Sequence, residues 1–415
     1  MGAETAPLGI YRRYSSKASQ CGAQNGTLHR STYLMENNLP RGGSAVSGHQ
    51  EAPKTLDKLV QRYALQSAAR ELLPREGVAK CMRVAIPNEK GERSVSVLYS
   101  PSVEAAHFGG LVICKSVWVC PICAAKISER RRVELTEGLK NWSSGEGPAG
   151  RRVLLVTFTL SHTRRDDLSV VFDALKRARA KLVSGRGSVE LRERFGLVGS
   201  IRALELTYGS NGWHPHLHVL MFFGRELPIL PFEAYLKGRW QECVAGAGGF
   251  ANWDNGCDVR FSDEEISTYV TKFGKEPKWT PAHEVTKAVV KLARAGGSTP
   301  MQLLSDFLSG DERAGRLWLQ YAVNFKGQRQ LVWSKGLREL LGLEAEKTDE
   351  EIAVEEEEDA LLLASLSVGA WRVILANDAR AEVLQIASAG DVDRLDTFLM
   401  ELGIPAGAGR REVRR

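Results

Sequence analysis

Three histidines, His214, His216 and His218, lie two residues apart in the otherwise apolar run GWHPHLHVLMFF, residues 212–223. The whole chain of 415 residues contains only eight histidines. Alternate side chains of a β-strand share a face, so a strand here would group the three imidazoles, with neighbouring Cβ atoms about 6–7 Å apart. Two such rings can lean toward a single ion, and neutral imidazoles suit a first-row divalent cation. The spacing therefore predicts a metal site on this strand.

A carboxylate on the preceding stretch is a candidate third ligand. Glu205 is the only acidic residue in the two strand-like stretches that flank residues 209–212, GSNG, which are typical of a hairpin turn. An unpaired buried carboxylate is unfavourable, and a cation would neutralise it. We therefore expect Glu205, His216 and His218 to bind a divalent ion. His214, nearest the turn, could compete with Glu205 or lie just outside the ligands, and the alternative for all three histidines is a core set bonded to the backbone.

A second group of reactive side chains lies in residues 263–276, which read as a helix with acidic residues in its first turn. Glu265 and Tyr269 are four residues apart and Lys272 follows three later, so they lie along one helix face. A phenol can attack phosphorus, an ammonium can stabilise developing negative charge, and a carboxylate can activate a second nucleophile. This face predicts phosphoryl-transfer chemistry, with an ordinary surface helix as the alternative.

Three of the seven cysteines crowd into ten residues, which indicates a metal site rather than disulfides. Cys120 and Cys123 form a CxxC pair, Cys114 lies just upstream, and Cys81 could complete a Cys₄ zinc site. Cys81 is distant in sequence, which loop closure tolerates, and His107 is a rival fourth ligand. A redox role for the CxxC pair would need a thioredoxin-like context, which the sequence lacks.

The net charge of +6 is unevenly distributed along the chain. Residues 344–360 contain ten carboxylates and one lysine, a net −9, so the remainder carries +15. A basic body with a separate acidic segment favours a polyanion as partner. Arg130, Arg131 and Arg132 could follow DNA phosphates, and Trp118 could stack on a base. The alternative for the arginines is a solvated helix start.

The order of the expected elements favours an α+β fold, a central antiparallel sheet with flanking helices. The expected strands are 151–161, 201–223 (two strands and their turn), 257–262 and 329–334, and the expected helices are 56–73, 128–142, 166–186 and 231–248. The expected parts are a disordered segment (1–55), a helix plus a small zinc-binding module (56–148), a catalytic domain (149–280), its mostly helical extension (281–343), an acidic linker (344–360) and a small helical C-terminal tail (361–415).

Together these motifs resemble the HUH endonuclease superfamily, whose histidine–hydrophobe–histidine signature is matched by residues 216–218. More narrowly, the chain resembles rolling-circle plasmid replication initiator (Rep) proteins of the single-tyrosine class with an N-terminal zinc cluster. Three motifs occur in the order of that family: LLVTFTLSH (154–162), WHPHLHVL (213–220) and EISTYVTKF (265–273). The resemblance covers roughly residues 78–343, including GQRQLVWSKGL at 327–337.

The resemblance implies roles for the residues of the third motif. Tyr269 matches the tyrosine that attacks a DNA phosphodiester, which forms a 5′-phosphotyrosine link and frees a 3′-OH primer. Lys272 matches a lysine near the scissile phosphate, and Glu265 matches the carboxylate that lets water perform the terminating cleavage. Relatives with two catalytic tyrosines carry the second one turn later, where this chain has Phe273.

The resemblance also implies the cofactors and partners. His216 and His218 match the ligands of a catalytic Mg²⁺ or Mn²⁺, Glu205 stands at the third-ligand position, and the cysteines match a structural zinc site. The expected partners are origin DNA, single-stranded or supercoiled, and a host helicase and polymerase, without a membrane. The start of the chain lacks the apolar middle of a signal peptide, so we expect a cytoplasmic protein. A zinc-containing rolling-circle transposase and a non-catalytic zinc DNA-binding regulator are alternative functions.

Overall fold

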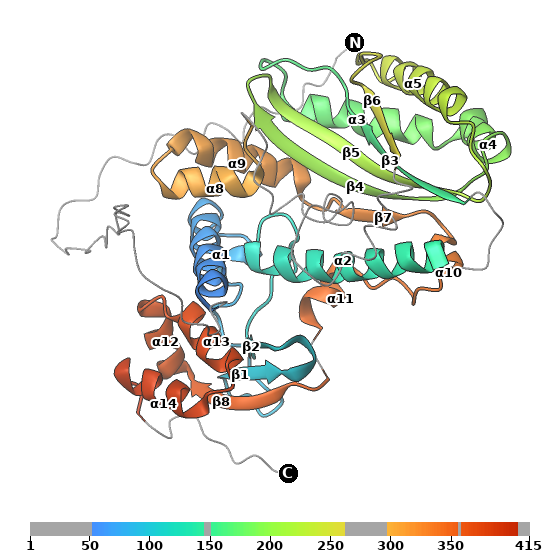
Figure 1. Ribbon diagram of the computed structural model, residues 1–415. Helices are drawn as coiled ribbons and strands as arrows, with labels where there is room; N and C mark the ends of the chain where they lie inside the picture. Colours follow the sequence, from blue (N-terminus) through green and yellow to red (C-terminus); the bar gives the residue numbers. More distant parts are fainter. Residues whose placement is uncertain (1–51, 145–150, 262–296, 356–357, 406–415) are drawn as a thin grey trace, which may run out of the picture. The chain divides into compact units, whose positions relative to one another are not determined.

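Figure 1 shows a computed structural model of the chain. It describes residues 52–144, 151–261, 297–355 and 358–405, which belong to one compact unit, Gln50–Arg415. Residues 263–276, with Glu265, Tyr269 and Lys272, lie outside the described part, and so does the expected disordered segment up to residue 51. The first described helix, α1 (Ala52–Leu72), begins four residues before the expected helix start at residue 56.

A five-stranded antiparallel sheet is the centre of the fold, with strand order β6-β3-β5-β4-β7. Its strands are β3 (Arg152–Phe158), β4 (Leu197–Gly209), β5 (Gly212–Phe223), β6 (Cys257–Phe261) and β7 (Leu331–Trp333). Strands β4 and β5 form the expected hairpin. At its turn, Gly212 has a φ of +87°, and a Cβ there would lie 3.0 Å from the Cα of Arg164, so glycine suits this position.

The two faces of this sheet pack against different helices (Figure 1). Leu217, Val219 and Met221 point to the face covered by α3 (Leu168–Leu182), α5 (Ile229–Ala245) and α9 (Glu312–Phe325). Leu220 and Phe222 point to the opposite face, where they pack with residues of α2 (Pro121–Ser144) and α10 (Leu337–Leu340). The apolar residues of β5 therefore fix its register, because each face of the strand is held by its own core.

All four expected helices differ somewhat in their bounds, and two of them differ in a way that has a local cause. Helix α2 begins at Pro121, seven residues earlier than expected, because proline is tolerated in the first turn of a helix. The stretch 166–186 is not one helix: α3 ends at Leu182, and α4 (Gly185–Glu193) begins at a glycine with a φ of +63°. That left-handed conformation interrupts the helical path.

Helix α8 (Pro300–Leu308) precedes α9.

A smaller antiparallel sheet, with strand order β2-β1-β8, joins two distant parts of the chain. Strands β1 (Ser94–Ser100) and β2 (Ala105–Gly109) form a hairpin around the 3₁₀ turn Pro101–Val103, and β8 (Leu361–Ser367) pairs with β1. The last part of the chain was expected to be wholly helical, but it begins with this strand. Its side chains at positions 364 and 366 enter the apolar core of the sheet, which holds them extended. Helices α12 (Val368–Ala376), α13 (Arg380–Ser388) and α14 (Val392–Glu401) follow.

The acidic segment contains a short helix, α11 (Asp349–Val354). Thr348 and Glu351 cap its start reciprocally: the Thr348 hydroxyl accepts from the Glu351 backbone N–H, and the Glu351 carboxylate accepts from the Thr348 N–H. Ile352 and Ala353 are buried. Helix α11 contacts α2, so this part of the segment is folded against the body.

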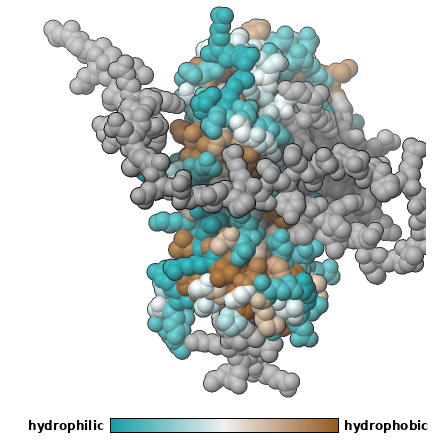
Figure 2. Space-filling view, turned by 90° about the vertical axis from the view of Figure 1, so that its left-hand side faces the viewer, coloured by the Kyte–Doolittle hydropathy of each residue, from teal (hydrophilic) through white to brown (hydrophobic). Residues whose placement is uncertain are grey.

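Within the described ranges, no helix is long and apolar enough to cross a bilayer. On the face drawn in Figure 2, hydrophobic residues form separate patches between hydrophilic ones.

Candidate metal centre

Glu205, His216 and His218 converge on the face of the large sheet that also packs against α2. The pairing of β4 with β5 sets Glu205 directly opposite His216, and His218 follows on the same face. Oε2 of Glu205 lies 2.8 Å from Nε2 of His218 and 3.3 Å from Nε2 of His216. Three ligand atoms around one ion with bonds of about 2.1 Å would be about 3 Å apart, so the group fits a small divalent cation.

The hydrogen bonds around His216 provide a chemical test of this fit. Nδ1 of His216 lies 3.2 Å from the carbonyl oxygen of His214. A carbonyl oxygen only accepts, so in a neutral ring this Nδ1 carries the proton and Nε2 presents a lone pair. That lone pair faces the carboxylate of Glu205, and a cation between the two atoms would relieve their repulsion. The donor set therefore suits a metal ion better than a neutral hydrogen-bonded core.

Glu205 is only 5% exposed, yet the site favours its charged form. Burial alone would raise the pKa of this carboxyl group, but the His216 and His218 rings, when both of their nitrogens carry protons, hold it well below its ordinary value through hydrogen bonds and positive charge. A buried carboxylate that stays ionised is a suitable metal ligand.

A threonine on the neighbouring strand orients one of the histidines. The hydroxyl of Thr157, on β3, lies 3.1 Å from Nδ1 of His218. Such a contact fixes the ring orientation and directs Nε2 toward the ion. Sequence reasoning missed Thr157, although its strand was predicted and its partner on β5 follows from the antiparallel pairing.

His214 belongs to a second histidine pair beside the triad. Its Nδ1 lies 2.7 Å from Nε2 of His162, and Nδ1 of His162 lies 3.0 Å from the carbonyl oxygen of Asn211. Burial, with smaller contributions from His216 and His162, lowers the pKa of His214 to about 4. His214 thus lies just outside the convergent group. His162, at the end of the first motif stretch, was not singled out from the sequence.

The four expected cysteines also converge. Sγ of Cys81 lies 3.6 Å from that of Cys123 and 3.7 Å from that of Cys120, and Sγ of Cys114 lies 3.7 Å from that of Cys123. These spacings exclude disulfides and match four thiolates at about 2.3 Å around a tetrahedral zinc ion, which would be about 3.8 Å apart. The rival ligand His107 lies on β2, outside this group.

Polar groups around the cluster stabilise thiolate charge. Hydrogen bonds from Cys114, Cys123 and Cys81 hold the pKa of Cys120 well below its ordinary value, whereas hydrogen bonds to the neighbouring thiols raise the pKa of Cys81 and of Cys123, so without a metal the negative charge is concentrated on Cys120. The side-chain amide of Gln66, on α1, approaches Sγ of Cys120 at 3.6 Å. The Cys114 backbone N–H donates to Sγ of Cys81 at 3.3 Å. Such contacts orient thiolate ligands before a metal binds.

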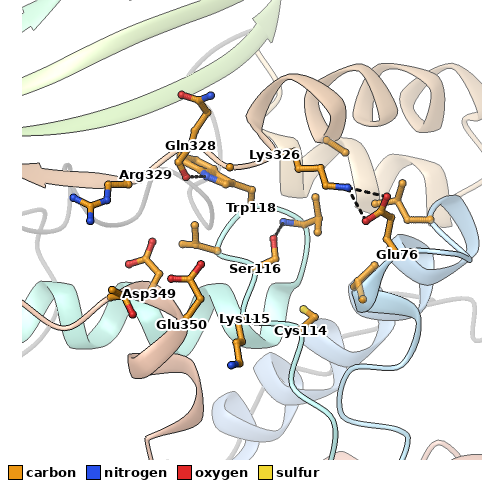
Figure 3. Close-up of a pocket in the computed structure, with 18 of the residues that line it drawn as sticks. Glu76, Cys114, Lys115, Ser116, Trp118, Lys326, Gln328, Arg329, Asp349 and Glu350 are labelled. Atoms are coloured by element: carbon orange, nitrogen blue, oxygen red, sulfur yellow. Dashed lines mark hydrogen bonds and ion pairs between the residues drawn. The ribbon is translucent and has the colours of Figure 1, made fainter.

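Of the four residues expected to contact DNA, two are buried in the structure. Trp118 is buried, and Figure 3 shows its indole N–H donating to the carbonyl oxygen of Gln328 at 2.7 Å. Arg131 is 3% exposed and is bound to Asp349 of α11 at 3.0 Å and to Glu134 at 3.1 Å. In this structure neither Trp118 nor Arg131 can contact DNA as expected, because intramolecular partners far along the chain enclose them.

The other two arginines of this group are more accessible. Arg130 is partly buried, and Arg132 forms an ion pair with Glu129 near the surface. Only these two of the four expected residues retain access to a polyanion.

These observations define an α+β protein with two groups that could hold a metal ion, a His–His–Glu group on an antiparallel hairpin and a separate Cys₄ group. A family model described as "Replication protein" matches residues 108–378, which is more than half of the chain. The chain therefore belongs to this family of replication proteins, in agreement with the resemblance that its motifs carry.

Two curated relatives are similar to parts of the chain. "Protein rep" of Streptomyces lividans is 29% identical over 333 residues, which cover 64% of this chain and 71% of the relative. "Neomycin resistance protein" of Streptomyces cyanogenus is 35% identical over 140 residues, which cover 28% of this chain and 31% of the relative. No solved structure shows significant similarity to the chain.

Proposed function

We propose that this replication protein initiates rolling-circle plasmid replication by nicking one strand of origin DNA. The observation that carries the proposal is the convergence of Glu205, His216 and His218 on one hairpin face, because this oxygen and nitrogen set suits Mg²⁺ or Mn²⁺. An ion held there would polarise the scissile phosphate. Membership in a family of replication proteins supports DNA as the substrate.

The nicking step uses the tyrosine of the third motif. Oη of Tyr269 attacks the phosphorus of the scissile phosphodiester, a new phosphorus–oxygen bond forms, and the bond to the 3′ oxygen breaks. The phenol proton is transferred overall to the departing 3′ oxygen, which leaves a 3′-OH primer and a 5′-phosphotyrosine link. Lys272 stabilises the negative charge on the phosphoryl oxygens.

Termination uses the carboxylate four residues before the nucleophile. After one round of synthesis the regenerated site is cleaved, and Glu265 accepts a proton from the water that attacks the phosphorus. A free 3′-OH can attack the 5′-phosphotyrosine link in the same way, which joins the strand ends and restores Tyr269. Phe273 offers no second nucleophile, so hydrolysis rather than a second covalent step completes the cycle.

The remaining groups of the chain support this role. The cysteine group would hold a structural Zn²⁺, and Arg130 and Arg132 could contact phosphates. The 3′-OH product is the substrate that a host polymerase extends, and a host helicase would separate the strands ahead of it. This activity belongs in the cytoplasm, where plasmid DNA is replicated.

The decisive experiment is a nicking assay on supercoiled plasmid that carries the candidate origin, with Mg²⁺ or Mn²⁺. Wild-type protein should produce relaxed plasmid and a DNA-linked protein band. Tyr269→Phe should give neither product, whereas Tyr99→Phe, on β1, is the matched control and should act like wild type. Glu265→Ala should nick but accumulate the covalent species.

Three results would contradict parts of the proposal. If wild-type protein binds the origin but never relaxes it, the chain is better described as a DNA-binding regulator. Nicking by Tyr269→Phe would remove the nucleophile assignment. Normal termination by Glu265→Ala would remove the role of Glu265.

A further inference from the structure

Two exposed aromatic side chains lie three residues apart on one loop near the histidines. The loop 246–256 connects α5 to β6 and carries Phe250, 64% exposed, and Trp253, 45% exposed. Across all residues whose exposure the structure describes, these are the only aromatic side chains in the exposed class. Large aromatic rings are normally buried, so their pairing on one loop calls for an explanation.

The loop holds these rings on a fixed backbone. The Ser161 N–H donates to the carbonyl oxygen of Phe250 at 2.8 Å, and the Thr159 N–H donates to that of Gly256 at 2.9 Å. The side-chain oxygen of Asn252 accepts from the Asp254 N–H at 2.8 Å. These bonds tie the loop to the chain just after β3 and reduce the entropy that a ligand would have to overcome.

Trp253 rests against a position of α5 that has no side chain. A Cβ built on Gly238 would lie 3.9 Å from Cζ3 of Trp253, so the edge of the indole lies close to the helix. The ring is supported from one side while almost half of the side chain remains accessible.

A polar cleft of about 570 Å³ adjoins the loop. Its lining includes Ser161, His162, Asn211, His214, Asn252 and Asn255. These side chains offer hydroxyl, amide and imidazole groups, which both donate and accept hydrogen bonds. His214 lines the cleft, and its ring lies 5.1 Å from that of His216, measured between centroids, so the cleft is adjacent to the Glu–His–His group.

Positive charge borders the same cleft. Arg164 and Arg165 are exposed on the segment that crosses the β4–β5 turn, and the backbone of Arg164 contacts Gly212 of that turn. Asp166 and Asp254 lie nearby, so the cleft is not uniformly basic. Recognition there depends on stacking and hydrogen bonds together with local phosphate contacts, and not on net charge alone.

We propose that the cleft and the rings of Phe250 and Trp253 form a binding site for unpaired nucleotides of single-stranded DNA beside the metal centre. Bases inside a duplex are covered by their neighbours, whereas unpaired bases can stack on exposed aromatic rings. The amide and hydroxyl groups of the cleft would bind base edges and sugar-phosphate oxygens. This inference rests on the proposed nicking function and identifies where the unpaired strand lies.

The test is a binding titration of the full chain without added divalent ions, so that no nicking occurs. The probe is a labelled thymidine oligonucleotide of about 20 nucleotides, and its fluorescence anisotropy reports binding. Phe250→Ala and Trp253→Ala should each weaken binding about tenfold or more, and the double variant should weaken it further. Phe250→Tyr and Trp253→Tyr should retain most of the affinity, because the new ring can still stack.

Matched controls separate stacking from other effects. Leu230→Ala removes an exposed apolar side chain at the other end of α5 and should leave binding unchanged. None of the aromatic substitutions should weaken binding to a duplex of the same length. An oligonucleotide of abasic sites should bind wild-type protein weakly and should not distinguish the variants.

The inference is wrong if Phe250→Ala and Trp253→Ala bind the thymidine oligonucleotide as tightly as wild type, or if they lose affinity for the abasic strand equally. It is also wrong if these substitutions convert a dimer to a monomer, because the rings would then contact a second copy. A chain that fails to nick but shows the expected binding pattern refutes the proposed function alone. If wild-type protein nicks normally but Phe250→Ala and Trp253→Ala bind the thymidine oligonucleotide as tightly as wild type, only this binding site is refuted.

Discussion

At the scale of single residues, one carboxylate oxygen organises the candidate metal centre. Oε2 of Glu205 contacts both Nε2 of His216 and Nε2 of His218. The Nδ1 atoms of the two rings have their own partners, the His214 carbonyl oxygen and the Thr157 hydroxyl. The two rings are therefore fixed on both sides, which directs the Nε2 atoms to one point.

Replacing Glu205 by glutamine tests whether metal binding depends on the negative charge of this side chain or only on its size. Glu205→Gln keeps the volume but removes the negative charge, so divalent-ion affinity should fall and nicking should decrease by at least about a hundredfold. The measurements are isothermal titration with Mn²⁺ and the plasmid-relaxation rate. Glu226→Gln, at an exposed position just after β5, is the matched control. Unchanged Mn²⁺ affinity in Glu205→Gln would exclude this carboxylate as a ligand.

The orienting role of Thr157 has a distinct signature. Thr157→Val keeps the β-branched shape and the strand but removes the hydroxyl that contacts Nδ1 of His218. We expect metal affinity to fall about tenfold to a hundredfold, as is typical when a group behind a ligand is removed. High Mn²⁺ concentration should restore nicking in this variant, and a rate that stays low at saturation would argue against an orienting role.

At the scale of elements, the contact between α2 and α11 depends on Arg131. Its guanidinium group binds the Asp349 carboxylate and the Lys347 carbonyl oxygen of the acidic segment, as well as Glu134 of its own helix. Because the arginine is buried, loss of its charge would deprive the Asp349 carboxylate of its ion pair in a poorly hydrated position, whereas Glu134 would keep its pair with Arg338. Its neighbour Arg132 forms a more exposed pair with Glu129.

These adjacent arginines therefore predict unequal effects on stability. Arg131→Met should lower the free energy of unfolding by about 3–5 kcal/mol, the usual effect of breaking a buried ion pair. Arg132→Met should lower it by less than about 1 kcal/mol, because exposed pairs contribute little. Denaturant titration followed by circular dichroism measures both. Equal losses in the two variants would contradict the different environments of the two arginines.

The cysteine group makes a prediction about metal content. Purified chain should contain about one zinc ion, and Cys81→Ser should remove most of it and lower the thermal unfolding midpoint. Cys243→Ser, a buried cysteine on α5 outside the group, should keep the zinc. His107→Ala should keep it as well. Elemental analysis decides the matter, and a wild-type chain without zinc would refute a structural zinc site.

Local patterns in the sequence predict the hairpin and its facing residues well, because strand alternation and the turn at 209–212 act over short distances. The convergence of Glu205 with His216 follows from that register. The environments of Trp118 and Arg131 could not be predicted in this way. Each depends on a partner about two hundred residues away, Gln328 and Asp349 respectively, and no periodic pattern encodes such a contact.

At the scale of the whole molecule, the last part of the chain is connected to the cysteine group. Arg380 of α13 donates to the side-chain oxygen of Gln66, and the amide of Gln66 reaches Sγ of Cys120. The guanidinium group also lies 4.0 Å from the ring centroid of Tyr63. Burial lowers the pKa of Arg380 to about 10, so the group remains charged at neutral pH. Helix α13 thus contacts, through Gln66, a cysteine of the group that lies about 260 residues earlier in the chain.

This connection predicts that the C-terminal part is required for folding and is not a separable tail. A chain that ends after residue 355 would lose β8, the strand that pairs with β1. It would also lose the indole of Trp371, whose ring centroid lies 4.9 Å from that of Phe108. The exposed edge of β1 and its apolar core should make this chain aggregate or lose zinc. A chain that ends after residue 405 keeps every described element and should behave as full-length protein. Size-exclusion chromatography with zinc analysis distinguishes the outcomes. If the chain ending at 355 is monomeric and keeps its zinc, the C-terminal part folds independently of the cysteine group.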